Sequence, residues 1–289
     1  MKILVPLDGT PLAESVLPCA HALARGWQSE LVLVRVVDDM STAAPDLSPS
    51  LLLQMKEQAV QASALYLKSV ADGLEGTRVT VETQVGAAAE QLASVAVRER
   101  CSLLVMASHG HTGAGRWLLG SVAERLLRLA HCEVLLLRPP ASPAASFQHI
   151  MVAVDGSQAS LAVVPKIAAY LVSGGRVTLL QVSSASLLQR FAGFGAEEAR
   201  AHQNDLRQKL GQVRLEGIAL EVQVLEGDPA DTLVDWAQQN GCDLIAMSTH
   251  GRTGFSHLWL GSVTAKVARH SHCAVLVVPH PEGPKGLTL

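Results

Sequence analysis

The stretch that decides the fold is ASHGHTGAGRWLLGSV at residues 107–122, because it returns as STHGRTGFSHLWLGSV at residues 248–263. Both copies follow a short apolar run. Each contains closely spaced glycine and small hydroxyl residues, and each leads into an amphipathic run. Glycine lets a backbone approach a ligand closely, and the N–H groups of a helix N-terminus attract anions. The pattern therefore indicates a phosphate-binding loop between a strand and a helix, and it occurs twice.

The repeat extends over the rest of the chain. Asp8, in an Asp-Gly-Thr turn near the N-terminus, matches Asp155 in an Asp-Gly-Ser turn. Each half contains roughly 140 residues, which is enough for a hydrophobic core of its own. We predict two domains, residues 1–140 and 147–280, joined by a proline-rich linker.

Each half alternates apolar strand runs with helical patterns, which is typical of a parallel sheet with helices on both faces. In the first half we predict strands at 3–7, 31–37, 78–85, 103–106 and 133–137 and helices at 11–25, 49–71, 88–99 and 121–129. In the second half we predict strands at 149–154, 177–182, 219–225, 244–247 and 274–278 and helices at 160–172, 196–213, 229–239 and 262–269. The fold class is therefore α/β, with two repeated doubly wound domains of five parallel strands each.

The composition narrows the possible partners. Hydrophobic residues make up 48% of the chain, charged residues make up 17%, and the net charge is −3, a balance that disfavours a nucleic-acid partner. No apolar run reaches membrane-spanning length and the N-terminus lacks the layout of a signal peptide, so we expect a cytoplasmic protein without membrane contact. The five cysteines form no CxxC pair, and we interpret them as buried small residues.

The two loops resemble those of the universal stress protein family in its tandem two-domain form. The ATP-binding branch of that family carries G-x2-G-x9-G-[ST] after its fourth strand. The first half keeps this spacing at Ala107, Gly110, Gly120, Ser121 and Val122, and the second half keeps it at Ser248, Gly251, Gly261, Ser262 and Val263. Ala107 and Ser248 replace the leading glycine. The resemblance implies a strand order of 3-2-1-4-5 and ATP as the ligand, with or without Mg²⁺.

Further site residues follow from the same resemblance. Asp8 and Asp155 match the acidic residue that approaches the nucleoside, although each is equally suited to stabilising its own turn. Val36 and Val182 match the apolar position that lies against the adenine. Ser121 and Ser262 are also placed to cap the helices that they open.

Two basic side chains lie within the first loop. His109 adjoins the phosphate glycine, where a structural imidazole is the alternative to a phosphate contact. Arg116 is suited to meet the terminal phosphates. His257 replaces Arg116 in the second half, which favours the first half as the ATP site.

The sequence thus predicts a stress-response or signalling protein that binds ATP as a regulatory ligand. It is not expected to be an enzyme beyond slow ATP hydrolysis, because it holds neither a GxxxxGK[ST] P-loop nor an evident general base. The alternative is an interaction module that binds no nucleotide and acts by dimerisation and partner docking, as the replaced leading glycines would allow. The resemblance also implies that last strands pair antiparallel, either between the two halves as a pseudo-dimer or in a homodimer.

Overall fold

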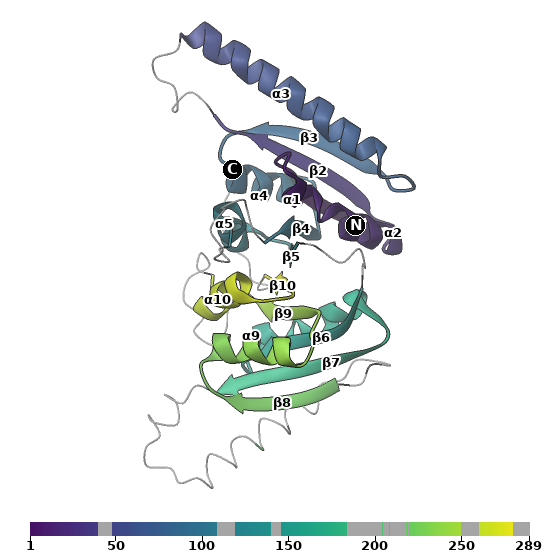
Figure 1. Ribbon diagram of the computed structural model, residues 1–289, viewed down its shortest axis with the longest axis vertical. Helices are drawn as coiled ribbons and strands as arrows, with labels where there is room; N and C mark the ends of the chain where they lie inside the picture. Colours follow the sequence, from purple (N-terminus) through teal and green to yellow (C-terminus); the bar gives the residue numbers. More distant parts are fainter. Residues whose placement is uncertain are drawn as a thin grey trace. The chain divides into compact units, whose positions relative to one another are not determined.

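The computed structural model describes residues 1–39, 48–108, 119–139, 146–183, 220–249 and 260–279, together with positions 204, 208 and 218. The chain divides into two compact units, Met1–Ala145 and Ser146–Leu289, which Figure 1 shows as the purple-to-blue and the teal-to-yellow parts of the ribbon. The finer limits of the two domains, 1–140 and 147–280, stay a prediction.

The first unit is built on five parallel strands. They are β1 (Lys2–Pro6), β2 (Glu30–Val37), β3 (Val79–Val85), β4 (Leu103–Ala107) and β5 (Glu133–Leu137). Their order across the sheet is β3-β2-β1-β4-β5, so Leu4 of β1 pairs with Val32 on one side and with Leu104 on the other. All three side chains are fully buried. The predicted order 3-2-1-4-5 is confirmed.

The second unit repeats this arrangement. Its strands are β6 (Phe147–Val154), β7 (Leu171–Ser183), β8 (Leu220–Glu226), β9 (Leu244–Ser248) and β10 (Ala274–Val278). They are parallel and lie in the order β8-β7-β6-β9-β10, which is again 3-2-1-4-5. The predicted fold class, with two repeated doubly wound domains, is therefore confirmed.

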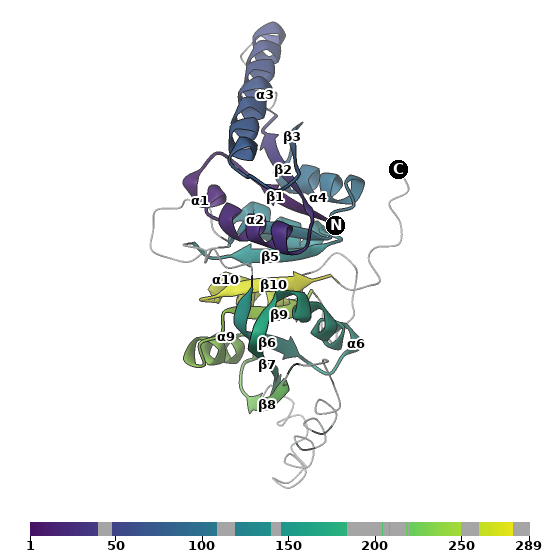
Figure 2. The ribbon, with the colours of Figure 1, turned by 90° about the vertical axis from the view of Figure 1, so that its right-hand side faces the viewer.

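Helices cover both faces of each sheet, as continuous apolar strands require. The first unit has α1 (Pro11–Glu14), α2 (Leu17–Gly26), α3 (Pro49–Asp72), α4 (Ala88–Arg98) and α5 (Ser121–Leu129). The described helices of the second unit are α6 (Gln158–Leu161), the 3-10 helix η1 (Val164–Tyr170), α9 (Pro229–Gln239) and α10 (Ser262–His270). Helix α3 runs along β2 and β3, and α9 lies beside α10 (Figures 1 and 2). The predicted helix at 196–213 falls almost entirely outside the described residues.

One prediction is wrong in the same place in both units. The single helix expected at 11–25 is divided into α1 and α2, and the helix expected at 160–172 is divided into α6 and η1. Pro18 and Pro165 stand at equivalent positions just after each break. Proline lacks the N–H that a continuous helix would need there, and its ring clashes with the preceding turn. In addition, β7 begins at Leu171, earlier than the expected residue 177.

Candidate functional site

Two neighbouring central strands end at the same edge of each sheet. In the first unit β1 is followed by Asp8, and its neighbour β4 ends at Ala107. In the second unit β6 is followed by Asp155, and its neighbour β9 ends at Ser248. Because the strand order reverses between these pairs, this carboxyl edge is where open α/β sheets bind ligands. The sequence predicted the strands that the candidate loops follow, and ligand binding by these loops stays a prediction.

Both aspartates stabilise the turns that contain them. Oδ1 of Asp8 accepts hydrogen bonds from the backbone N–H of Thr10 at 2.8 Å and from its hydroxyl at 2.6 Å. Thr10 in turn caps α1. Oδ1 of Asp155 accepts a bond from the N–H of Ser157 at 3.0 Å, and Ser157 caps α6. The turn role is therefore present in both units, and Asp8 is exposed. A nucleoside contact of either carboxylate stays a prediction.

The helices that follow the fourth strands begin at glycine. Gly120 is the N-cap of α5 and Gly261 is the N-cap of α10, and neither helix has a side-chain cap. The N–H of Gly261 donates to the carbonyl of Thr249 at 2.9 Å, and a Cβ on Gly261 would lie only 3.1 Å from that oxygen. The expectation that the neighbouring serines cap these helices is wrong. Ser121 and Ser262 are the first helical residues instead.

Among the residues that the structure describes, no side chain caps the first turns of α5 and α10. The first N–H groups of a helix have no partner within the helix, and an uncapped N-terminus is suited to an anion. Ser121 and Ser262 are exposed beside these turns, and Val122 and Val263 are half-buried. The chemistry therefore fits a phosphate group at both positions.

The other predicted site residues lie on the same edge where they are described. Ala107 is half-buried, whereas Ser248 is buried and its carbonyl accepts a hydrogen bond from Thr264 of α10 at 3.0 Å. Val36 and Val182 are half-buried near the ends of the second strands β2 and β7. Their contacts with a ligand stay predictions. The remaining predicted residues, His109, Gly110, Arg116 and Gly251, lie outside the described residues.

A polar cluster at this edge was missed by sequence reasoning. The guanidinium of Arg35, on β2, lies over the ring of Tyr66 of α3, with 5.0 Å between Cζ and the ring centroid. The Tyr66 hydroxyl donates to Glu14 Oε1 at 2.7 Å. Burial, together with this bond, raises the pKa of Tyr66 above its ordinary value. The available signal was Arg35 itself, a charge within the otherwise apolar run at residues 31–37.

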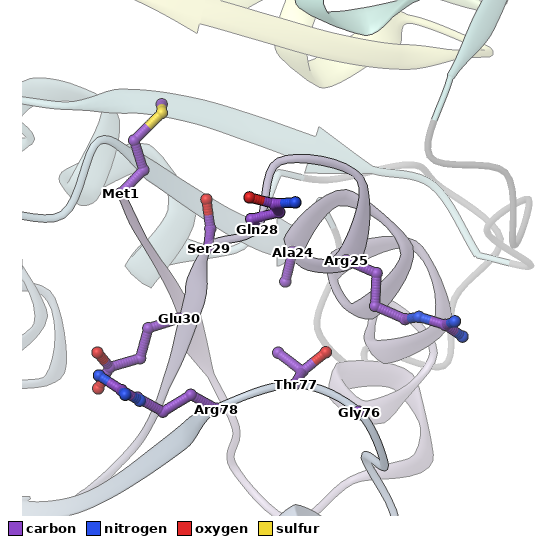
Figure 3. Close-up of a pocket in the computed structure, with 9 residues that line it drawn as sticks. All are labelled: Met1, Ala24, Arg25, Gln28, Ser29, Glu30, Gly76, Thr77 and Arg78. Carbon is purple, nitrogen blue, oxygen red and sulfur yellow. The ribbon is translucent and has the colours of Figure 1, made fainter.

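A separate cavity of about 540 Å³ opens at the opposite, amino edge of the first sheet (Figure 3). It lies between the end of α2 and the residues that begin β2 and precede β3. The lining residues are Met1, Ala24, Arg25, Gln28, Ser29, Glu30, Gly76, Thr77 and Arg78. Arg25 points away from its centre (Figure 3), and none of the predicted site residues lines it.

The cysteines behave as buried small residues. Cys19, Cys101, Cys132 and Cys242 are buried, Cys273 is half-buried, and all five are free thiols. Burial raises the pKa of Cys19 and of Cys101 to about 11, and that of Cys132 and of Cys242 to about 12, which suppresses the reactive thiolate.

Within the described ranges, no group of three or more metal-ligating side chains is arranged for an ion. None of the helices described is long and apolar enough to cross a bilayer.

The sequence matches the model of the universal stress protein family twice, over residues 1–138 and 146–279. The universal stress protein Rv2623 of Mycobacterium tuberculosis is 28% identical over 290 residues, covering 96% of each chain. The universal stress protein MJ0531 of Methanocaldococcus jannaschii is 32% identical over 141 residues, which cover 48% of this chain and 82% of that protein.

A solved structure supports the same fold. The crystal structure of a universal stress protein from Archaeoglobus fulgidus superimposes with a TM-score of 0.72 at 20% identity, covering 96% of this chain and 98% of that one. The two family matches, this superposition and the repeated order 3-2-1-4-5 show that the whole domain is duplicated, and not the loops alone. The chain belongs to the universal stress protein family and carries two copies of its domain in tandem.

Proposed function

We propose that this protein binds ATP as a regulatory ligand at the carboxyl edges of its sheets and acts in the cytoplasm in a stress response. The observation that carries the proposal is the pair of glycine-capped helices, α5 and α10, whose first turns are capped by no side chain of the described ranges. Each stands beside the loop where the strand order reverses. The spacing between the loop glycine and the Gly-Ser pair, which is the same in both halves, supports the same ligand.

The proposed role of ATP is regulatory. Phosphoryl transfer requires a group that orients the attacking nucleophile and a means of neutralising charge on the phosphates, and the aspartates of this edge are already engaged in their turns. Mg²⁺ would be coordinated by the phosphates of ATP rather than by a set of protein ligands. Regulation would act through association of last strands, within the chain as a pseudo-dimer or between chains as a homodimer.

Mass analysis of small molecules released from the purified, denatured protein tests the ligand directly. We expect an adenine nucleotide, and calorimetry of the emptied protein with ATP and Mg²⁺ should restore binding. Gly261→Ala is the informative variant, because its Cβ would meet the Thr249 carbonyl at 3.1 Å and displace the start of α10. Gly26→Ala is the control, since Gly26 lies in α2 outside the candidate site, does not have a left-handed backbone, and has no atom within 4 Å of a Cβ built on it. Absence of both released nucleotide and calorimetric heat would defeat the proposal.

The second candidate is an interaction module that binds no nucleotide. Ala107 and Ser248 favour it, because each places a Cβ where the ATP-binding motif has glycine. Restoring the motif with Ala107→Gly and Ser248→Gly separates the two functions. If ATP is the natural ligand, the unaltered chain already binds it and the variants bind it more tightly. Binding that appears only in the variants would favour the interaction module.

A further inference from the structure

The guanidinium of Arg35 is held in place by two neighbours. The Tyr66 ring lies beneath it, and the Tyr66 hydroxyl is itself fixed by Glu14. Gly9 is the second neighbour, since a Cβ built on it would be 3.2 Å from Nη1 of Arg35 and 3.3 Å from Cζ. A guanidinium stacked in this way loses little further freedom when it binds a ligand.

No hydrogen bond of the Arg35 guanidinium is formed with the described part of the chain. Among the residues that the structure describes, no acceptor lies within hydrogen-bonding or ion-pairing distance of its guanidinium. Arg35 is half-buried rather than fully enclosed. The planar N–H fork of its guanidinium matches the paired oxygens of a phosphate or carboxylate.

The location of Arg35 connects it to the candidate site. Gly9, which its guanidinium contacts, directly follows Asp8 in the loop that ends β1. The side chain therefore reaches from β2 across to the point where the strand order reverses. A ligand that approached the Asp8 carboxylate would lie next to the guanidinium.

In the described part of the second unit, a neutral residue stands at the position equivalent to Arg35. Gln181 takes the place of Arg35 in the sheet register, opposite the end of β6. It is 4% exposed, and its Oε1 has no hydrogen-bond partner among the described residues. Gly156, the counterpart of Gly9, has no atom within 4 Å of a Cβ built on it, so no described side chain crosses that loop.

We propose that Arg35, positioned by Tyr66, binds a phosphate group of the nucleotide held by the first domain, and that the second domain lacks this contact. The inference rests on the proposed nucleotide binding. Asp8 and Glu14 place two negative charges near the single positive charge of Arg35, so charge alone does not favour a phosphate there. The planar pair of N–H groups on the guanidinium supplies the preference for a phosphate, and the ammonium group of lysine does not have that geometry.

Calorimetric titration of the full chain tests this with four probes: adenosine, adenosine 5′-monophosphate, adenosine 3′-monophosphate and ATP. Arg35→Gln, which gives the first domain the residue of the second, should weaken the first-domain affinity for a phosphorylated probe roughly tenfold or more. Adenosine affinity should stay unchanged. The phosphate position that loses its advantage, 5′ or 3′, identifies the group that Arg35 binds. Arg35→Lys and Tyr66→Leu should lose the same preference, because one lacks the fork and the other lacks the stacking surface.

Arg25→Gln is the matched control, because it removes the same charge at the amino edge of the same sheet, and its affinities should equal those of the unaltered chain. Equal losses for adenosine and for every phosphorylated probe, no loss at all, or the same loss in Arg25→Gln would each overturn the role of Arg35. If the unaltered chain binds none of the four probes, the proposed nucleotide function has failed. If it binds them and Arg35→Gln binds them equally well, only the role of Arg35 has failed.

Discussion

The glycine that follows the first strand has different requirements in the two domains. Gly9 and Gly156 both adopt left-handed backbone conformations, with φ of +87° and +83°, which cost a residue with a Cβ roughly 1–2 kcal/mol. Gly9 also packs against Arg35, whereas Gly156 faces open space. We predict that Gly9→Ala lowers the free energy of unfolding more than Gly156→Ala does, as measured by urea denaturation.

A double-mutant cycle assigns the difference to its cause. In an Arg35→Gln background the tight contact is removed, so Gly9→Ala should there cost about as much as Gly156→Ala. An excess cost of Gly9→Ala that persists without the guanidinium would contradict this account and point to the turn alone.

His149 makes the stability of the second domain depend on pH. Its Nδ1 lies 3.2 Å from the carbonyl of Asn240 and its Nε2 lies 3.0 Å from the hydroxyl of Thr178. These partners fit a neutral ring that donates from Nδ1 and accepts at Nε2. Burial, assisted by the nearby positive charge of Arg176, lowers the pKa of His149 below 6.5.

The sign of the pH effect follows from this shift. Between the lowered folded-state pKa and 6.5, the unfolded chain binds a proton that the folded chain does not, so the free energy of unfolding falls as the pH falls through this window, by at most about 1.4 kcal/mol per pH unit. Urea denaturation at pH 5 to 8 should show the fall, and His149→Gln should flatten it. Above pH 7 the two curves should run parallel. An NMR titration of His149 with a midpoint at or above 6.5 would contradict the prediction.

At the scale of helices, α9 and α10 have different kinds of N-terminus. Asp228 caps α9 by accepting from the N–H of Asp231 at 3.1 Å, whereas α10 begins at Gly261 without a side-chain cap. Asp228→Ala should therefore lower the free energy of unfolding by about 1 kcal/mol. Ser262→Ala should lower it by less than about 0.5 kcal/mol, since the exposed Ser262 hydroxyl caps nothing.

Asp228→Asn separates capping from charge in the same measurement. Lys266 of α10 pairs with Asp228 at 3.2 Å and with Asp231 at 2.8 Å, and such exposed pairs contribute little. The asparagine variant keeps an oxygen for the cap and should retain most of the stability. A loss in Asp228→Asn as large as that in Asp228→Ala would show that the ion pair matters more than the cap.

The sequence predicted the strands well because their apolar runs are bounded by clear breaks. β5 and β10 begin and end where expected, as does α5. The first helix of each domain was predicted as continuous because its apolar periodicity runs on past the break, although Pro18 and Pro165 were visible in the sequence. The loss of the helical N–H at each proline outweighed the periodicity.

The candidate site was predictable only in part. The turns at Asp8 and Asp155 follow from short-range chemistry, and so does the glycine spacing. The contact between Arg35 and Tyr66 was not predictable, because it depends on how far and at what angle α3 lies over β2. Local patterns fix the apolar face of a helix but not its position along the sheet.

At the scale of the whole molecule, the two domains share one fold but place different polar side chains at equivalent positions. Lys2 of the first domain forms an ion pair with Glu99 at 2.7 Å, whereas its counterpart His149 is buried and hydrogen-bonded. The pair Arg35 and Gln181 shows the same trend towards a buried neutral side chain in the second domain. The duplication has therefore kept the sheet while the polar residues at both of its edges have diverged.

The two cores should also respond separately to mutation. Leu104 of β4 and Ile245 of β9 occupy equivalent places and are fully buried, so replacing either by alanine should cost about 2–5 kcal/mol in its own domain. In hydrogen exchange followed by mass spectrometry, Leu104→Ala should reduce protection of β1, β2, β4 and β5 and leave β6, β7, β9 and β10 unchanged. Ile245→Ala should do the reverse, so that each variant is the control for the other. Loss of protection across both sets of strands in either variant would show that the two units unfold as one cooperative body.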